Sequence, residues 1–260
     1  MENINSDYDY MEIVWQIRQN IPSNPSGRVS KYLLKVFRFD LYKFRKKLLK
    51  PHKETLLHRL IRVECEVVFR AFLPNLQDLS GFLKPYLDKH LTDQELMARL
   101  GEWSKRYEQN PEKAELYPKD LLLASMLPLS DFVDKIIFPI LFSDRLFLFR
   151  FNLLLSDLTA SLNEELTSEI MNKNGYIKRQ DPPKWLREGI KRRDKKLCVE
   201  CEKYLGSEKV EEGGQLDHII PLAKHGTNDP TNYQLLCEKC NQEKGTKEIR
   251  PPQPKTIYWQ

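Results

Sequence analysis

The chain has 260 residues, of which 40% are hydrophobic and 30% charged, and its formal net charge is +5. This length accommodates one large and one small domain, and the composition is ordinary for a soluble protein that buries a core. The N-terminal stretch MENINSDYDYMEIVW is acidic and polar, and it lacks the basic flank and apolar run of a secretory signal. We therefore expect a cytoplasmic protein, whose mild positive charge is compatible with a polyanionic partner.

The chain before about residue 180 is predicted to be helical. It contains few glycines and long stretches in which apolar residues recur with a period near 3.6. Prolines mark several helix ends, and Thr92 followed by Glu95 is typical of a capping box. Cys65, in this region, is expected to be a buried, unreactive thiol. We expect a large all-helical domain over residues 1–175, with helices at about 8–20, 29–49, 53–73, 76–90, 92–108, 119–127, 130–142 and 145–172.

The stretch 136–155 is apolar enough to require comparison with a membrane span. A spanning helix needs about twenty predominantly apolar residues with few or no charges. This stretch is interrupted by a proline and four polar or charged residues, namely Pro139, Asp144, Arg145, Arg150 and Asn152. We therefore predict a pair of buried core helices here and no membrane span.

The segment from Arg28 to Arg62 is strongly basic, with twelve Lys or Arg against two acidic residues, Asp40 and Glu54. Leu33, Leu34, Phe37, Leu41, Phe44 and Leu48 fall mostly at three- and four-residue steps, so one apolar stripe is expected. A core-packed helix with a solvated basic face explains this pattern. A surface that contacts phosphates explains it equally well, and a membrane-surface helix is a more distant alternative.

The segment 172–183, NKNGYIKRQDPP, is predicted to link the two domains. Gly175 would end the preceding helix, and Pro182 and Pro183 would start the next one. That next helix ends in a run of cations, including Arg192, Arg193, Lys195 and Lys196. These side chains are candidates for phosphate contacts, although a solvated basic helix end is an equally good interpretation.

Four cysteines in two C-x-x-C pairs dominate the C-terminal part: Cys198 and Cys201, then Cys237 and Cys240. A pair with this spacing bends the backbone so that both sulfurs point at one ion, and two pairs supply the closed S4 site that structural zinc prefers. A reducing compartment also favours metal binding over disulfides. The insert between the pairs is longer than a zinc ribbon needs, and it carries Asp217, His218 and Asn232.

The motifs D-H-I-I-P-L, an Asn fourteen residues after the His, and C-x-x-C-N-x-x-K-G together resemble the HNH endonucleases over roughly residues 185–250. The resemblance implies a mainly α chain in which a small ββα-metal module, braced by zinc, occupies residues 182–250. It also implies a nuclease that acts on DNA with magnesium or manganese, in a defence or restriction role. The helical domain resembles no family, and it offers a possible surface for a protein partner.

The resemblance assigns His218 as general base, Asp217 and Asn241 as ligands of the catalytic cation, and Asn232 as the residue that fixes the loop and helps to orient His218. These roles suit the residue types, because neutral imidazole accepts protons near physiological pH and carboxylates are hard ligands. The final position is Asn241, where the family name expects His, which leaves the metal preference open. Lys244 is predicted to cap a helix end or to contact phosphate.

Neighbouring strand residues point to opposite faces, so Asp217 and His218 cannot both face one site from a regular strand. We therefore expect the pair at a strand end or bend, with His225 in an exposed loop beyond it. Two C-x-x-C pairs alone are more typical of a binding module than of an enzyme. The alternative function is accordingly a zinc-braced nucleic-acid-binding or adaptor protein without catalytic activity.

Overall fold

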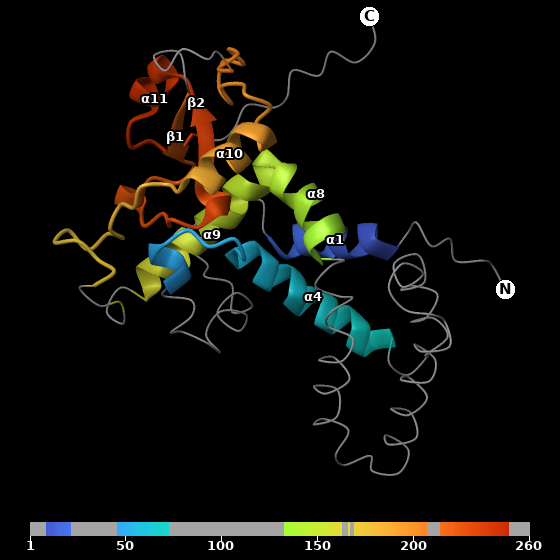
Figure 1. Cartoon of the computed structure of the whole chain (residues 1–260). Helices are drawn as coiled ribbons and strands as arrows, with labels where there is room; N and C mark the ends of the chain where they lie inside the picture. Colours follow the sequence, from blue (N-terminus) through green and yellow to red (C-terminus); the bar gives the residue numbers. More distant parts are fainter. Residues whose placement is uncertain are drawn as a thin grey trace, which may run out of the picture. The chain divides into compact units, whose positions relative to one another are not determined.

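The computed structural model describes residues 9–21, 46–72, 133–162, 166, 169–206 and 214–249. The chain divides into two compact units, residues 1–20 with 58–140 and residues 21–57 with 141–260. Figure 1 labels helices and strands of the described residues. The helices predicted at 76–90, 92–108 and 119–127, and most of the helix predicted at 29–49, lie outside the described residues.

The first unit contains α1 (Asp9–Asn20), most of α4 (Leu56–Phe72) and the π-helical turn η2 (Val133–Ile137). The bounds of α1 and α4 confirm the helices expected at 8–20 and 53–73. Asn20 Nδ2 donates to Glu64 Oε1 over 3.2 Å, and burial raises the pKa of that carboxyl. The buried apolar side chains include Ile13, Val14, Ile17, Leu60, Ile61, Cys65 and Ile137.

The apolar stretch that resembled a membrane span forms two helices, α8 (Phe138–Ser143) and α9 (Arg145–Ser161). Asp144 separates them and caps α9, because its Oδ1 accepts from Phe147 N over 2.9 Å. Within the described part of the chain, no helix is long and apolar enough to cross a membrane. Residues along α9 are buried, among them Phe147, Leu148, Phe151, Leu154, Leu155 and Leu158.

The helix predicted at 145–172 is too long, because α9 ends at Ser161. Met171 instead pairs with Ile177 in an isolated antiparallel bridge. Asn172 Oδ1 accepts from the backbone nitrogens of Asn174 and Tyr176, which favours a turn over a further helical turn. Gly175, with φ of +74°, lies in this turn and is not a helix C-cap as predicted.

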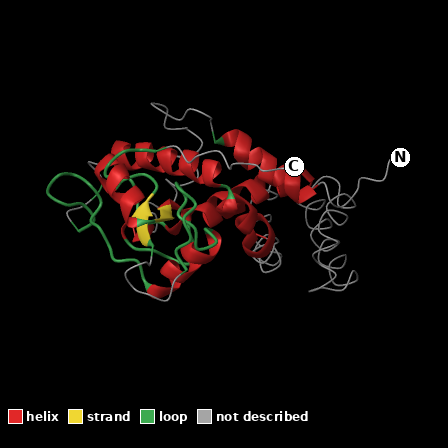
Figure 2. Ribbon diagram, turned by 90° about the horizontal axis from the view of Figure 1, so that it is seen from above, coloured by secondary structure: helices red, strands yellow, loops and turns green. Residues whose placement is uncertain are grey.

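The C-terminal part forms a ββα unit, as the resemblance implied. Helix α10 (Lys184–Arg193) is followed by strand β1 (Gln215–His218), strand β2 (Tyr233–Leu236) and helix α11 (Glu238–Lys244). The strands are antiparallel and appear side by side in Figure 2, with His218 opposite Tyr233 and Gln215 opposite Leu236. Residues of β2, of α10 and of the loop after α10 pack together in one buried cluster: Leu186, Ile190, Cys198, Val199, Leu205, Tyr233, Leu235, Leu236 and Cys237.

The fourteen residues between the strands are folded by two 3₁₀ turns, η5 (Leu222–Lys224) and η6 (Pro230–Asn232). Residues 46–57, from the predicted basic segment, pack against this connection within the second unit. Asn228 N donates to Leu48 O over 3.0 Å, and Leu56 N, at the start of α4, donates to Asp229 Oδ2 over 2.8 Å. A part of the chain remote in sequence therefore supports the loop that follows His218.

Candidate active site and metal centre

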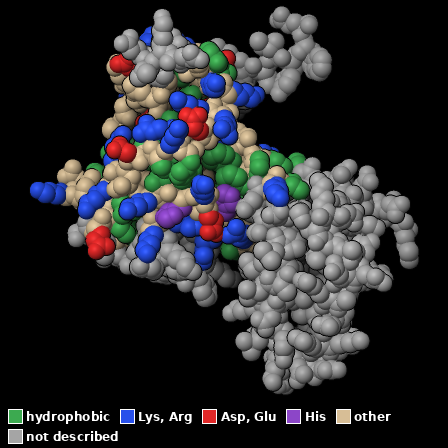
Figure 3. Space-filling view, in the orientation of Figure 1, with side chains coloured by type: hydrophobic (Ala, Val, Ile, Leu, Met, Phe, Trp, Pro, Cys, Tyr) green, Lys and Arg blue, Asp and Glu red, His purple; other side chains and the backbone are tan. Residues whose placement is uncertain are grey.

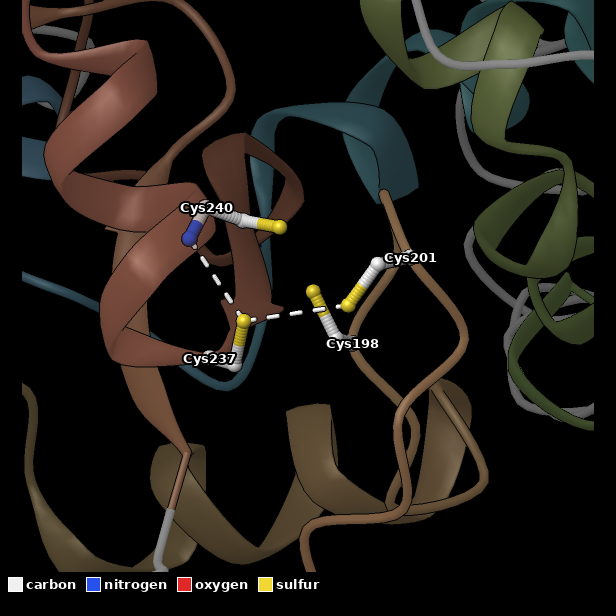
Figure 4. A group of neighbouring side chains, drawn as sticks. All are labelled: Cys198, Cys201, Cys237 and Cys240. Carbon is white, nitrogen blue, oxygen red and sulfur yellow. Dashed lines mark hydrogen bonds between the residues drawn. The ribbon is translucent and has the colours of Figure 1, made fainter.

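The four paired cysteines lie together. Their sulfurs are all within 4.8 Å of one another, and the Sγ atoms of Cys201 and Cys237 are 3.7 Å apart. A tetrahedral ion with Zn–S bonds of about 2.3 Å needs sulfurs about 3.8 Å apart, so the cluster fits one metal ion. Figure 4 shows the four side chains turned toward a common centre, two from the loop after α10 and two from the start of α11.

Local backbone geometry explains why the sulfurs converge. In the first pair, Glu202 N donates to Cys198 O over 2.9 Å and Glu202 has a φ of +60°, which makes a tight turn. Val199 N donates to Leu235 O over 3.0 Å, which joins this turn to β2. In the second pair, Cys237 is the N-cap of α11, and its Sγ accepts from Cys240 N over 3.5 Å.

Asp217 and His218 are the last two residues of β1, as expected for a pair at a strand end. Their side chains nevertheless have different partners. Asp217 Oδ2 is 2.8 Å from Lys244 Nζ and accepts from Gln234 Nε2 over 3.2 Å. His218 lies against Tyr233, with ring centroids 4.5 Å apart, and its Nε2 is 3.1 Å from Asn228 Oδ1. The two side chains therefore occupy opposite faces of the sheet.

The Asp217 face of β1 meets α11. Gln215, two residues before Asp217, accepts a hydrogen bond of 2.6 Å from Asn241 Nδ2. Gln215 and Asp217 share a face because strand side chains alternate, and Asn241 and Lys244 share a face because they are three residues apart on a helix. The carboxylate of Asp217 and the amide oxygen of Asn241 are thus hard donors on facing elements, a donor set that suits magnesium or manganese.

Lys244 is not at the surface. Its side chain is 1% exposed, and Nζ donates to the backbone oxygen of His218 over 2.8 Å in addition to its ion pair with Asp217. The ammonium is already engaged inside the module, and the phosphate contact of Lys244 stays a prediction from sequence. The predicted helix cap is wrong, since Gly245 is the C-cap residue of α11.

His218 is 3% exposed, and burial lowers the pKa of its imidazole from 6.5 to about 4, against the opposing effect of the hydrogen bond with Asn228. The largest cause is the loss of water around the charged form. The side chain is consequently neutral at physiological pH, and one ring nitrogen then carries a lone pair that can accept a proton.

Asn232 is fully buried and holds the loop between the strands. Its Oδ1 accepts from Ile220 N over 2.8 Å, and its Nδ2 donates to the backbone oxygens of Ile220 and Thr227 over 3.0 and 2.9 Å. These bonds close the loop that begins directly after His218. The side-chain partner of His218 is instead Asn228, four residues before Asn232.

Of the cations predicted to contact phosphate, Arg192, Lys195 and Lys196 are exposed. Lys195 and Lys196 both have φ of +55°, so the chain reverses sharply after α10. Arg193 is different, because its side chain is 5% exposed, forms an ion pair of 2.9 Å with Asp194 and donates to Tyr233 O over 2.6 Å. Its contact with phosphate stays a prediction from sequence. Figure 3 shows many further Lys and Arg side chains on the described surface.

His225, the loop histidine, is half-buried and has a φ of +58°. Its ring lies edge-on to Tyr176, with centroids 5.2 Å apart, and no described residue hydrogen-bonds its buried Nδ1. It is therefore less exposed than the sequence predicted. None of its described contacts is with Asp217 or Asn241.

Two residues that support the site were missed by sequence reasoning. Asn228 contacts His218, and Asp194 accepts from Leu235 N over 2.9 Å and so links α10 to β2. The tripeptide Asn228–Pro230 carried a turn signal, which predicts a loop but not a side-chain partner for His218. Nothing in the sequence around Asp194, which lies in a run of charged residues, indicated its contact with β2.

Comparisons with known proteins agree with this geometry. The model of a family described as HNH endonuclease matches residues 198–247, which include the cysteine cluster and the ββα unit. A relative named "Probable HNH endonuclease", from Lactococcus phage SK1, is 31% identical over 90 residues, which cover 32% of this chain and 87% of the relative. No solved structure matches significantly. The match to most of the phage protein and the family model together establish that this chain belongs to the HNH endonuclease family.

Proposed function

We propose that this protein is a metal-dependent endonuclease that hydrolyses phosphodiester bonds in DNA, with His218 as general base and with Asp217 and Asn241 as ligands of a catalytic divalent cation. The observation that carries the proposal is the end of β1. There, a neutral imidazole and a carboxylate are consecutive residues, with Cα atoms about 3.8 Å apart. Their side chains point to opposite faces of the sheet, so we place the phosphate at the end of the strand, where both faces are within its reach. Asn241 of α11 bonds to Gln215 on the same face of β1 as Asp217.

His218 has the properties that a general base needs. Burial keeps the imidazole in its neutral form, and the opposing strand holds the ring through the contact with Tyr233. Water that attacks a phosphodiester must lose a proton, and a neutral imidazole is able to accept it. Asn232 supports this role indirectly, because it fixes the backbone of Ile220, two residues after the base.

Asp217 and Asn241 fit a hard divalent cation. When bound, magnesium or manganese supplies a Lewis acid that stabilises charge on the phosphate and on the leaving oxygen. Asp217 uses Oδ2 for both of its described contacts, and Asn241 uses Nδ2 for its contact with Gln215. The remaining oxygen of each side chain is the donor that we assign to the cation. Lys244 balances the charge of Asp217 in the absence of that cation.

The Cys198, Cys201, Cys237 and Cys240 cluster is assigned to a structural zinc ion. Four sulfurs fill the four coordination positions of a tetrahedral zinc ion, so no coordination position is left for water, as in closed structural sites. The exposed cations Arg192, Lys195 and Lys196 are assigned to the DNA backbone. The cytoplasmic location, a role in defence or restriction, and a protein partner for residues 1–175 stay predictions from sequence.

The proposal is tested by nicking of supercoiled plasmid with and without magnesium or manganese. The wild-type chain is expected to cleave only when the divalent cation is present. Changing His218→Ala removes the base and should lower the rate about 10²–10⁴-fold at every metal concentration. Changing Asp217→Ala should weaken metal binding, so that more metal partly restores cleavage. Changing His225→Asn is the matched control, because Asn tolerates a left-handed backbone and the residue has no role in the proposal.

Two results would contradict the proposal. Cleavage by the His218→Ala variant at the wild-type rate would exclude it as the base. Binding of DNA by wild-type protein without any cleavage, across the metals tested, would favour the alternative of a zinc-braced binding protein.

A further inference from the structure

The amide of Asn228 has only one orientation that satisfies its partners. Its Nδ2 is 2.8 Å from the backbone oxygen of Leu49 and 2.8 Å from that of Lys178. Backbone oxygens only accept hydrogen bonds, so the NH₂ group must face both of them. The reverse orientation would place the amide oxygen against two carbonyl oxygens. Asn228 is fully buried, which makes such unpaired contacts costly.

The amide oxygen of Asn228 consequently faces the active-site strands. Oδ1 accepts from the hydroxyl of Tyr233 over 3.2 Å and lies 3.1 Å from Nε2 of His218. Because an amide oxygen only accepts, Nε2 must be the protonated nitrogen of the neutral ring. We propose that Asn228 is a positioning residue that holds His218 as its Nε2–H tautomer and thereby presents the lone pair of Nδ1 as the base.

This inference rests on the proposed function for its catalytic meaning, but the hydrogen bond itself is independent of catalysis. The contacts of Asn228 also show that the end of the basic segment supports the site. Leu49 belongs to residues 46–57, and its carbonyl is one of the two groups that fix Asn228. Leu48 O accepts from Asn228 N over 3.0 Å, so the segment holds both the backbone and the side chain of the positioning residue. The base is thus oriented through residues about 170 positions away in sequence.

The tautomer of His218 is measurable without any change to the site. Long-range ¹H–¹⁵N spectra of the zinc-loaded full chain distinguish a protonated from an unprotonated nitrogen in each imidazole. The His218 signals are assigned by their loss in His218→Gln. The expected result near pH 7 is a protonated Nε2 and an unprotonated Nδ1. A ring protonated on Nδ1 would overturn the proposal, whether or not any variant folds.

Variants then test whether Asn228 is responsible. Changing Asn228→Ala should abolish the single-tautomer signature and lower kcat about 10–100-fold with little change in KM, by analogy with loss of the partner that orients a metal-binding histidine. Changing Asn228→Asp keeps an acceptor oxygen for Nε2, so the folded variant should retain the Nε2–H signature. It should lose stability, because its second oxygen faces the carbonyls of Leu49 and Lys178. The matched control is Asn152→Ala, which removes another buried amide. Its Nδ2 donates to Leu148 O and Thr231 O and has no described contact with His218.

The control variant should lose stability but keep the wild-type tautomer. An unchanged tautomer or unchanged kcat in folded Asn228→Ala would overturn the proposal, as would loss of the Nε2–H signature in folded Asn228→Asp. If the tautomer depends on Asn228 as expected but wild-type protein cleaves no DNA, the positioning role stands and the proposed function fails.

Discussion

Nζ of Lys244 lies 2.8 Å from Oδ2 of Asp217, and the lysine side chain is 1% exposed whereas the aspartate side chain is 13% exposed. The same ammonium donates to the backbone oxygen of His218 over 2.8 Å. A buried cation is costly unless it is paired and hydrogen-bonded, and here both conditions are met. The contact therefore fastens the last turn of α11 to the two residues at the end of β1.

Removing this ammonium should destabilise the C-terminal module. Lys244→Met keeps the length of the side chain but leaves Asp217 and a backbone carbonyl without their donor. Since Asp217 is partly exposed, we expect a loss of about 1–3 kcal/mol in the free energy of unfolding. Lys239→Met is the control on the same helix, because Lys239 pairs with Glu243 over 3.8 Å at the surface and should contribute less than about 0.5 kcal/mol. Equal midpoints of urea denaturation for the two variants would contradict this.

The same variant should change the response to metal. Lys244 places a positive charge beside the proposed ligand Asp217, and a divalent cation must bind against that charge. In Lys244→Met, cleavage should reach its half-maximal rate at a lower magnesium concentration than in wild-type protein. The measurement is a magnesium titration of cleavage at fixed ionic strength. A higher half-maximal concentration would indicate that Lys244 helps to hold the site rather than competing for Asp217.

The cysteine cluster should be part of the folding energy of the module. Cys237→Ser removes one of four ligands and also the sulfur that accepts from Cys240 N at the start of α11. We expect loss of zinc and of protection from hydrogen exchange in β1, β2 and α11, while α1 keeps its protection. Cys65→Ala is the control, since Cys65 is buried in the first unit and lies outside the cluster. Metal analysis that finds no zinc in wild-type protein would contradict the assignment.

Short-range patterns in the sequence predicted the cysteine cluster and the ββα unit better than the contacts around them. The spacing of the cysteines and the order of Asp217, His218, Asn232 and Asn241 predicted the cluster and the ββα unit, because local backbone geometry and the family pattern determine them. Burial was harder to predict. Arg193 and Lys244 were interpreted as surface cations, yet each is paired with an acid inside the module. A sequence gives no sign that a charge in a basic run has a partner elsewhere in the fold.

Long-range partners were not predicted for the same reason. Asn228 binds the carbonyls of Leu49 and Lys178, which are 179 and 50 residues away in sequence, and Asp229 accepts from Leu56. Periodicity in residues 28–62 predicted an apolar stripe, but it could not show which surface the end of that segment contacts. The helix predicted at 145–172 ran too far because apolar periodicity continues after Ser161, whereas the side chain of Asn172 stabilises a turn at residues 172–176.

The pH dependence of cleavage should reflect the lowered pKa of His218. A base with a pKa of about 4 is unprotonated at any pH well above 4, and it loses activity only as pH falls through that value. At saturating metal, kcat/KM should therefore stay nearly constant from about pH 8 to pH 5, with no inflection near the 6.5 of an ordinary histidine. Zinc content must be followed in parallel, because thiolate ligands bind protons in acid. An inflection near 6.5 with zinc retained would contradict the buried, neutral base.

The exposed cations after α10 should control how DNA affinity depends on salt. Each phosphate contact that is lost should reduce the slope of log affinity against log salt concentration by about 0.9. Arg192→Gln, Lys195→Gln and Lys196→Gln, tested singly, are expected to show this reduction for double-stranded DNA of any sequence, because backbone contacts carry no base preference. Lys173→Gln is the control, since Lys173 is an exposed cation in the turn at residues 172–176, before α10. The measurement is binding in calcium, so that affinity is separated from cleavage. Slopes equal to that of the control would show that the three cations are merely solvated.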